Sequence, residues 1–350
     1  MIALPEINPP LINASGILSY PEVFRALEAS GAALGGYVTK SVGPAEGAGN
    51  ENPVVVCPED EGQPLLNSLA LPTQSPEDWE ADLAQTRLES SRLIVSIYGG
   101  GPDEFGEIAA RMSPFADLIE VNLSCPNRVP GEVALMESIG QRPDLSGEVI
   151  GRVRDSTTKP VIAKLSPNSD YLAVAAACMD AGADGLGCGN TLGPGLAIDT
   201  VTGKAILAGT TGGISGPALK PVNLRMTYEC YALFGCPIIG YGGIGSWEDA
   251  VEYTLAGACI LGIGTAFLGK TTSEAAGLTR RIWEGVQAYL GGAPFPEMVG
   301  RAHRDPAPEA ARSHTLATRR STTTEAFGSC RLRSRVGGPS HRAARCRCRT

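Results

Sequence analysis

Short apolar runs alternate with longer amphipathic stretches through the first 304 residues of the 350-residue chain. The apolar runs are rich in Val, Ile and Leu, which is typical of β-strands, and the stretches between them are long enough for helices. Strands are predicted at residues 11–14, 36–39, 93–97, 118–123, 161–165, 185–188, 237–240 and 259–262.

Several of the intervening stretches open with Ser, Pro or Asp, which favour the first turn of a helix. Helices are predicted, for example, at residues 103–112, 169–181, 217–234 and 246–256. Repeated strand–helix units build a parallel sheet, and eight of them suggest a closed barrel. The predicted fold class is therefore α/β, a (β/α)8 TIM barrel, over residues 1–304.

Polar residues stand where the predicted strands end, which is where barrels of this kind place their chemistry. They are Lys40 after the second strand, Ser96 in the third, Asn122 and Cys125 after the fourth, Lys164 in the fifth, and Asn190 and Thr191 after the sixth. The chain has only six lysines, and two of them stand here. A lysine at the end of an inward-facing strand must reach solvent or meet an anion.

The segment 120–127 places the thiol of Cys125 between the amides of Asn122 and Asn127. A thiol held there can act as a base, and the amides can pair with the polar edges of a flat substrate. This arrangement predicts an enzyme. The alternatives are a strand-end cap at Asn122, a packed thiol at Cys125, and turns at Asn127 and Asn190.

Glycines follow the last two predicted strands, as Gly242-Gly243 and Gly264-Thr265, and a further run ending at Gly216 precedes a predicted helix. Backbone N–H groups exposed by glycine near helix N-termini form anion sites, and in barrels these commonly hold a phosphate. A phosphate-bearing cofactor is expected. Ordinary turns are the alternative explanation for each glycine taken alone.

Composition narrows the class further. A hydrophobic content of 43% with 44 Gly and 26 Pro fits a turn-rich globular protein. No stretch approaches the roughly 20 apolar residues of a membrane span, and the first residues do not resemble a secretory signal, so a cytoplasmic protein without a membrane partner is expected. The ten cysteines lack paired CxxC spacing, so no metal or iron–sulfur site is predicted.

Residues 305–350 differ from the rest of the chain. They contain ten Arg, no Lys and three acidic residues, a balance of +7, so the first 304 residues carry −15. The segment has no hydrophobic periodicity, and we predict a basic, disordered C-terminal tail. A nucleic-acid arm is the alternative, but a solvated extension or a segment altered by a change of reading frame is favoured, so no nucleic-acid partner is expected.

The chain resembles the soluble, class 1 dihydroorotate dehydrogenases over about residues 1–304. The resemblance rests on Asn13–Gly16, Val38–Ser41, Leu66-Asn67, Asn122–Asn127, Ala163–Asn168, Gly189–Thr191, Gly212–Pro221, Gly242–Ile244 and Gly264-Thr265. It implies an FMN-bearing barrel that oxidises dihydroorotate to orotate in pyrimidine biosynthesis. Cys125 would take the C5 proton while hydride leaves C6 for N5 of FMN.

The resemblance also implies two sets of binding residues. The cofactor set is Ser15, Lys40, Ser41, Ser96, Asn122, Lys164, Gly216, Gly242, Gly243, Gly264 and Thr265. The substrate set is Lys40, Asn67, Ser68, Leu69, Ala70, Leu71, Asn122, Asn127, Asn190 and Thr191. The chain departs from the family pattern at Ser96 and Thr73, where the family has amides, and at Ala70, where it has glycine.

Members of this family differ in their electron acceptor. One soluble type is a homodimer that reduces fumarate, and another pairs with a smaller FAD and [2Fe–2S] subunit, in a heterotetramer, and passes electrons to NAD. The resemblance favours the second type. Two other functions stay open: a flavin domain like that of dihydropyrimidine dehydrogenase, which commonly has His where this chain has Asn127, and a non-redox barrel that binds a phosphorylated metabolite.

Overall fold

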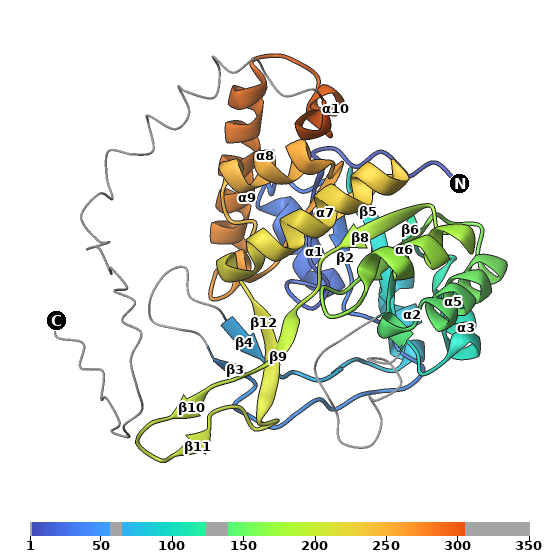
Figure 1. Cartoon of the computed structure of the whole chain (residues 1–350), viewed down its shortest axis with the longest axis vertical. Coiled ribbons are helices and arrows are strands. Elements are labelled where there is room, and N and C mark those ends of the chain that lie inside the picture. Colours follow the sequence, from blue (N-terminus) through green and yellow to red (C-terminus); the bar gives the residue numbers. More distant parts are fainter. Residues whose placement is uncertain (1, 57–64, 124–138, 305–350) are drawn as a thin grey trace, which may run out of the picture. The chain divides into compact units, whose positions relative to one another are not determined.

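The computed structural model describes residues 2–56, 65–123 and 139–304, which belong to one compact unit. Its centre is a closed barrel of eight parallel strands (Figure 1). In order around the barrel they are β1 (Leu11–Asn13), β2 (Gly36–Val38), β5 (Arg92–Ile97), β6 (Leu118–Asn122), β7 (Val161–Leu165), β8 (Gly185–Cys188), β13 (Ile238–Tyr241) and β14 (Ile260–Ile263). Each overlaps a predicted strand, and the predicted (β/α)8 TIM barrel is confirmed.

Helices surround the barrel and connect its strands. They are α1 (Pro21–Ala29), α2 (Pro76–Ala84), α3 (Pro102–Met112), α5 (Pro143–Ser156), α6 (Tyr171–Asp180), α7 (Lys220–Phe234), α8 (Trp247–Ala256), α9 (Thr272–Leu290) and α10 (Phe295–Met298). The starts of α8 and α9 carry reciprocal capping boxes at Ser246 and Thr271, which satisfy backbone N–H groups that the first turn leaves free. The four helices predicted as examples are confirmed.

The side chains of each strand alternate between the two faces of the barrel wall. One set points inward and forms the apolar barrel interior, comprising Ile12, Val38, Ile94, Leu118, Ile162, Ile239 and Ile260. Their neighbours, such as Ile119, Val121 and Val161, pack in the layer between strands and helices. Because strands have a period of two, the next inward positions toward the carboxyl ends include Glu120, Lys164 and Tyr241. These polar residues therefore cap the apolar interior.

A second, antiparallel sheet was not predicted. It consists of β3 (Val55–Val56), β4 (Leu65–Asn67), β12 (Thr211–Ser215) and β9 (Leu192–Leu196), with a short hairpin of β10 (Ile198–Asp199) and β11 (Lys204–Ala205) beyond it (Figure 1). In the glycine run before α7, residues 211–215 form β12, one of the two inner strands of this sheet. Gly216 follows β12 with φ of +92°.

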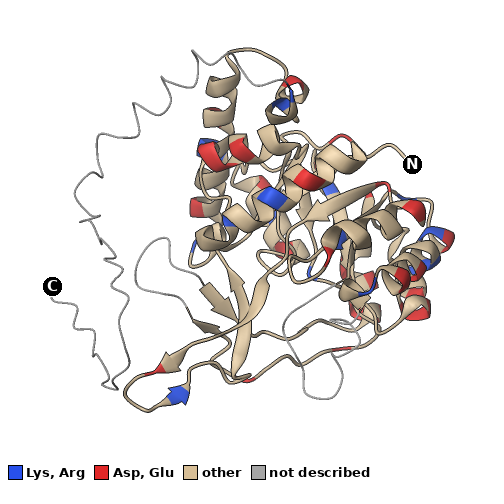
Figure 2. Cartoon of the chain, in the orientation of Figure 1, with Lys and Arg blue, Asp and Glu red and all other residues tan. Residues whose placement is uncertain are grey.

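Charged side chains lie mainly on the helices around the barrel, whereas the strands of the second sheet carry none (Figure 2). Cys178, Cys188, Cys230 and Cys236 are buried free thiols, as expected for cysteines in apolar runs. Among residues 2–56, 65–123 and 139–304, no helix is both long and apolar enough to cross a bilayer. Residues 305–350, for which a tail was predicted, lie outside the described residues.

Candidate active site

A cavity of about 250 Å³ lies at the carboxyl ends of the barrel strands, and the second sheet contributes Val55, Leu65, Asn67 and Ser215 to its wall. Most of the predicted site residues line it. They are Ser15, Lys40, Ser41, Asn67, Leu69, Leu71, Asn122, Lys164, Asn190, Thr191, Gly216, Gly242, Gly243, Gly264 and Thr265. Residues of the predicted cofactor and substrate sets thus share one cavity.

Three predicted residues lie behind the wall instead. Ser96 is fully buried, and its hydroxyl lies 3.0 Å from that of Ser41, which does line the cavity. The Ser68 hydroxyl accepts a hydrogen bond from Asn50 Nδ2 at 3.0 Å. Ala70 is buried and has φ of +59°. This backbone conformation favours glycine, which explains why the family pattern has glycine at this position.

The roles predicted for Cys125 and Asn127 are not tested, because both residues lie outside the described residues. They stay predictions. Thr73, which stands where the family pattern has an amide, is buried and accepts a hydrogen bond from Trp79 Nε1 at 3.0 Å. Its hydroxyl is therefore engaged by α2.

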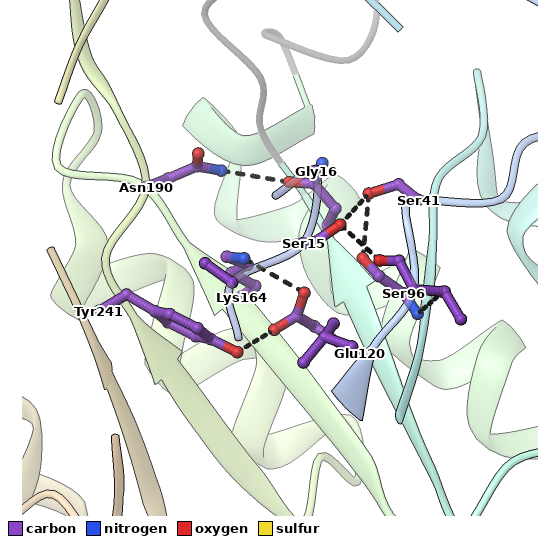
Figure 3. Close-up of polar contacts among 12 residues, drawn as sticks. Ser15, Gly16, Ser41, Ser96, Glu120, Lys164, Asn190 and Tyr241 are labelled. Carbon is purple, nitrogen blue, oxygen red and sulfur yellow. Dashed lines mark hydrogen bonds and ion pairs between the residues drawn. The ribbon is translucent and has the colours of Figure 1, made fainter. Parts of the chain in front are cut away.

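Lys164 lies on the cavity wall in a buried polar cluster with Glu120 and Tyr241 (Figure 3). Its Nζ is 3.2 Å from Glu120 Oε1 and 4.2 Å from the centroid of the Tyr241 ring. The Tyr241 hydroxyl donates to Glu120 Oε2 at 2.5 Å. Burial and the Glu120 charge raise the pKa of Tyr241 well above its ordinary value, so the phenol keeps its proton and remains a donor.

The barrel interior has space for this cluster because two inward positions on neighbouring strands are glycine. A Cβ at Gly187, paired with Lys164 across β7 and β8, would come 3.3 Å from three carbon atoms of that lysine. A Cβ at Gly262 would lie 2.0 Å from Tyr241 Cε1. These glycines therefore leave room for the lysine stem and the aromatic ring.

Lys40, the second strand-end lysine, approaches the backbone of the β1–α1 connection. A Cβ placed on Gly16 would lie 3.5 Å from Lys40 Nζ. The ammonium thus lies beside the chain that follows β1, on the same cavity wall as Lys164. Two cationic side chains at one cavity favour an anionic or electron-rich ligand.

Three hydroxyl groups form a chain that leads from the cavity into the barrel wall (Figure 3). Ser15 Oγ donates to Thr39 O at 2.8 Å and lies 3.2 Å from Ser41 Oγ, which in turn contacts Ser96 Oγ. The backbone N–H of Ser96 donates to Thr39 Oγ1 at 3.1 Å. This network fixes Ser15 and Ser41 on the wall.

Glycine turns after β13 and β14 form a further part of the wall. Gly242 and Gly243 have φ of +111° and +72°, which glycine adopts at no steric cost. A Cβ on Gly242 would lie 2.3 Å from Asn223 Nδ2. The turns at Gly264 and Gly216 precede short helical segments. Backbone N–H groups in such turns can bind an anion.

Amide groups complete the cavity. Asn190 Nδ2 donates to Asn122 Oδ1 at 3.2 Å, which joins the ends of β8 and β6. Asn223 Nδ2 faces the backbone oxygen of Asn190 at 3.4 Å. Within the described residues, Asn223 Oδ1 and Thr191 Oγ1 are buried without a hydrogen-bond partner. Buried polar atoms are rarely left unpaired, so a ligand or water is expected to pair with them.

Glu120, Tyr241 and Asn223 were not identified from the sequence. Glu120 and Tyr241 had a usable signal, because each stands two positions after an inward-facing apolar residue of its own strand, Leu118 and Ile239. Asn223 lies within α7, where helical periodicity alone does not distinguish a cavity wall from a packed interior.

Comparisons with known proteins agree with the resemblance. The family model described as "Dihydroorotate dehydrogenase" matches residues 2–285. A protein of Pyrococcus abyssi is 42% identical over 300 residues, covering 84% of this chain and 95% of its own length. One of Methanothermobacter thermautotrophicus is 37% identical, covering 85% and 96%, and one of Geotalea daltonii is 38% identical, covering 84% and 94%.

All three relatives carry the name "Dihydroorotate dehydrogenase B (NAD(+)), catalytic subunit". The family model covers most of the chain, and these relatives match it over nearly their whole length. The chain therefore belongs to the dihydroorotate dehydrogenase family, whose members are flavin-dependent oxidoreductases that act on a CH–CH bond.

Proposed function

We propose that this chain is the catalytic subunit of a cytoplasmic dihydroorotate dehydrogenase, which oxidises dihydroorotate to orotate with FMN in pyrimidine biosynthesis. The observation that carries the proposal is a single cavity that gathers both strand-end lysines, the amides of Asn67, Asn122 and Asn190, and the glycine turns. A phosphate-bearing flavin and a polar planar substrate together require this combination of groups.

FMN fits the residues around the cavity. The turns at Gly216, Gly242-Gly243 and Gly264-Thr265 would hold its phosphate through backbone N–H groups. Lys164 would lie by the N1/O2 edge of the flavin ring, where a cation favours the anionic reduced form. Ser15, Ser41, Lys40 and Asn122 would contact the flavin on the other side. Bound FMN supplies a hydride acceptor.

The substrate would be held by amides. Asn67, Asn122 and Asn190, together with Thr191 and Lys40, would pair with the ring edges and carboxylate of dihydroorotate. Such pairing discriminates strongly against analogues that lack a polar group. Cys125 would take the C5 proton on its sulfur, since a thiol is a usable base close to neutral pH.

The relatives whose names include "NAD(+)" and "catalytic subunit" support an NAD-linked electron acceptor. We infer that this chain passes its electrons to NAD through a smaller partner subunit that carries FAD and a [2Fe–2S] cluster, in a heterotetramer built on a homodimer of this chain. Copurification of such a subunit would support the inference. Oxidation of dihydroorotate by the isolated chain, with fumarate as the electron acceptor and no partner subunit, would contradict it.

The function is tested by anaerobic reduction of the bound flavin. Dihydroorotate should bleach the flavin absorbance of the purified protein, and dihydrouracil should not. Bleaching by dihydrouracil alone would instead indicate an enzyme like dihydropyrimidine dehydrogenase. A colourless protein that cannot be reconstituted with FMN would contradict the proposal and favour a non-redox barrel.

A further inference from the structure

Glu120 is a buried carboxylate that the proposed reaction does not use. Its side chain has no exposed surface, and it lies on β6 two positions before Asn122, on the same inward-facing side of the strand. A buried carboxylate without a partner is expensive, so such groups are paired or hydrogen-bonded. Both of its partners are known: Lys164 contacts Oε1 and Tyr241 contacts Oε2.

The geometry of these contacts fixes the ammonium of Lys164. It is held from one side by the carboxylate at 3.2 Å and from another by the face of the Tyr241 ring, whose centroid is 4.2 Å away. Only 8% of the lysine side chain is exposed, and that remainder belongs to a residue of the cavity wall. The lysine therefore presents its charge at one defined place.

The carboxylate also changes the net charge at that place. Lys164 alone would bring one positive charge to the cavity wall, whereas Lys164 with Glu120 forms a nearly neutral pair in a region of low dielectric. The Tyr241 hydroxyl donates a short hydrogen bond to the carboxylate and so offsets part of its negative charge, as expected for an O–H donor facing a charged acceptor. The three side chains together set the local electrostatic potential.

We propose that Glu120 and Tyr241 are positioning residues that hold the Lys164 ammonium against the flavin and limit its positive charge, so that they set the reduction potential of the cofactor. This inference rests on the proposed function, since it requires a flavin beside Lys164. It extends that function by assigning the electrostatic control of the site to two residues that contact Lys164.

The test is the two-electron midpoint potential of bound FMN in matched variants. Glu120→Gln removes the negative charge but keeps an oxygen that can accept a hydrogen bond. We expect the equilibrium constant for flavin reduction to rise about tenfold, a shift of about +30 mV for a two-electron couple. Tyr241→Phe keeps the ring over the ammonium but removes the donor, so the carboxylate charge is less moderated and the potential should fall.

A variant elsewhere in the barrel is the control for an effect of lowered fold stability on the potential. Asp184 is also a buried carboxylate, 2.8 Å from Arg154 Nη1, but it immediately precedes β8 and so lies at the amino ends of the strands, opposite the cavity. Asp184→Asn should lower the melting temperature and leave the potential unchanged. The dissociation constant of FMN, measured by fluorescence, provides a second readout for all variants.

Opposite shifts in Glu120→Gln and Tyr241→Phe, with no shift in Asp184→Asn, would support the proposal. An unchanged or lowered potential in Glu120→Gln would overturn it even if the wild-type flavin is reduced by dihydroorotate, and the proposed function would then stand. Failure of the wild-type protein to bind FMN would overturn both. If Glu120→Gln does not fold, the potential of Tyr241→Phe tests the proposal by itself. An unchanged or raised potential in Tyr241→Phe would overturn the proposal.

Discussion

At the scale of single residues, the site depends on a few inward-facing positions at the ends of barrel strands. Lys164, Glu120 and Tyr241 each stand two positions after an apolar inward-facing residue of the same strand, and each polar group in the cluster has a partner. A buried ion pair of this kind adds little to folding stability and is costly to break from one side. Its presence at the cavity wall therefore indicates a functional role.

The first prediction concerns Cys125, the proposed base. Replacing Cys125 with Ser should reduce turnover at neutral pH by roughly 100-fold, because a hydroxyl is a far weaker base than a thiol. Flavin binding should be retained, since the flavin is expected to depend on other residues. Steady-state kinetics and the flavin absorbance of the purified variant check both expectations. Undiminished turnover would contradict the assigned role.

A second prediction concerns the glycine turn after β13. Gly242→Ala should lower FMN affinity by about tenfold and destabilise the fold by roughly 1–3 kcal/mol, because the residue has φ of +111° and its Cβ would meet Asn223. Fluorescence titration with FMN and thermal melting measure these effects.

Gly245 provides the matched control in the same connection. A Cβ there would have its nearest neighbour at 3.7 Å, an ordinary contact, and the residue is not among the glycines with positive φ. Gly245→Ala should therefore leave FMN affinity nearly unchanged. Equal losses in the two variants would show that the conformation of Gly242 is not what holds the phosphate.

At the scale of elements, the barrel was predictable and the second sheet was not. The barrel strands are apolar runs separated by helices, so local patterning identifies them. The second sheet pairs strands far apart in sequence, such as β4 with β12. Its strands are two to five residues long, and β9 and β12 contain glycines and a proline that read as turns. Only the tertiary pairing distinguishes them from loops.

The candidate site, like the fold, was predictable only in part. Residues at or just after the ends of barrel strands, such as Lys40, Lys164 and Asn190, were found because strand ends can be located from sequence. Glu120 and Tyr241 belong to β6 and β13, and recognising them requires knowledge of which strand face points inward. Asn67 was assigned by resemblance alone, and it reaches the cavity through β4 of the sheet that was missed.

A third prediction concerns the pH dependence of folding stability, which arises from thiols buried between the helices and the strands. Burial raises the pKa of Cys178 in α6, and that of Cys236 before β13, to about 12, from an ordinary value of 9.0. Below pH 9 the thiols are protonated in both the folded and unfolded states, and their contribution to stability is fully present. As pH rises from 9 toward 12, the unfolded chain releases these protons first, so stability falls.

Urea denaturation at pH 7, 9 and 10 measures this effect. Each buried thiol should contribute a loss of about 1 kcal/mol in the free energy of unfolding between pH 9 and 10. Cys178→Ala should reduce that loss relative to the parent protein, whatever its effect at pH 7. An identical pH slope in the variant would contradict the assignment to Cys178.

At the scale of the whole molecule, the barrel and the second sheet form one catalytic unit. The sheet contributes a hydrogen-bonding amide, Asn67, and apolar side chains to the same cavity as the strand-end lysines. The chain's function therefore depends on residues 2–304 as a unit, and the family match to residues 2–285 covers most of it.

The fourth prediction concerns residues 305–350. A protein that ends at Arg304 should bind FMN with unchanged affinity and be reduced by dihydroorotate at an unchanged rate, because no predicted site residue lies beyond that point. Titration with FMN and anaerobic flavin reduction, both compared with the full chain, check this. A truncated protein that fails to fold would show that the C-terminal segment supports the barrel.

A crystal structure of the full chain with FMN and orotate would test the proposed function most directly. We expect the phosphate at the Gly242-Gly243 and Gly264-Thr265 turns, the Lys164 ammonium against the flavin ring, and the sulfur of Cys125 facing C5 of orotate. A phosphate bound elsewhere, or a Cys125 sulfur packed away from the ligand, would contradict it.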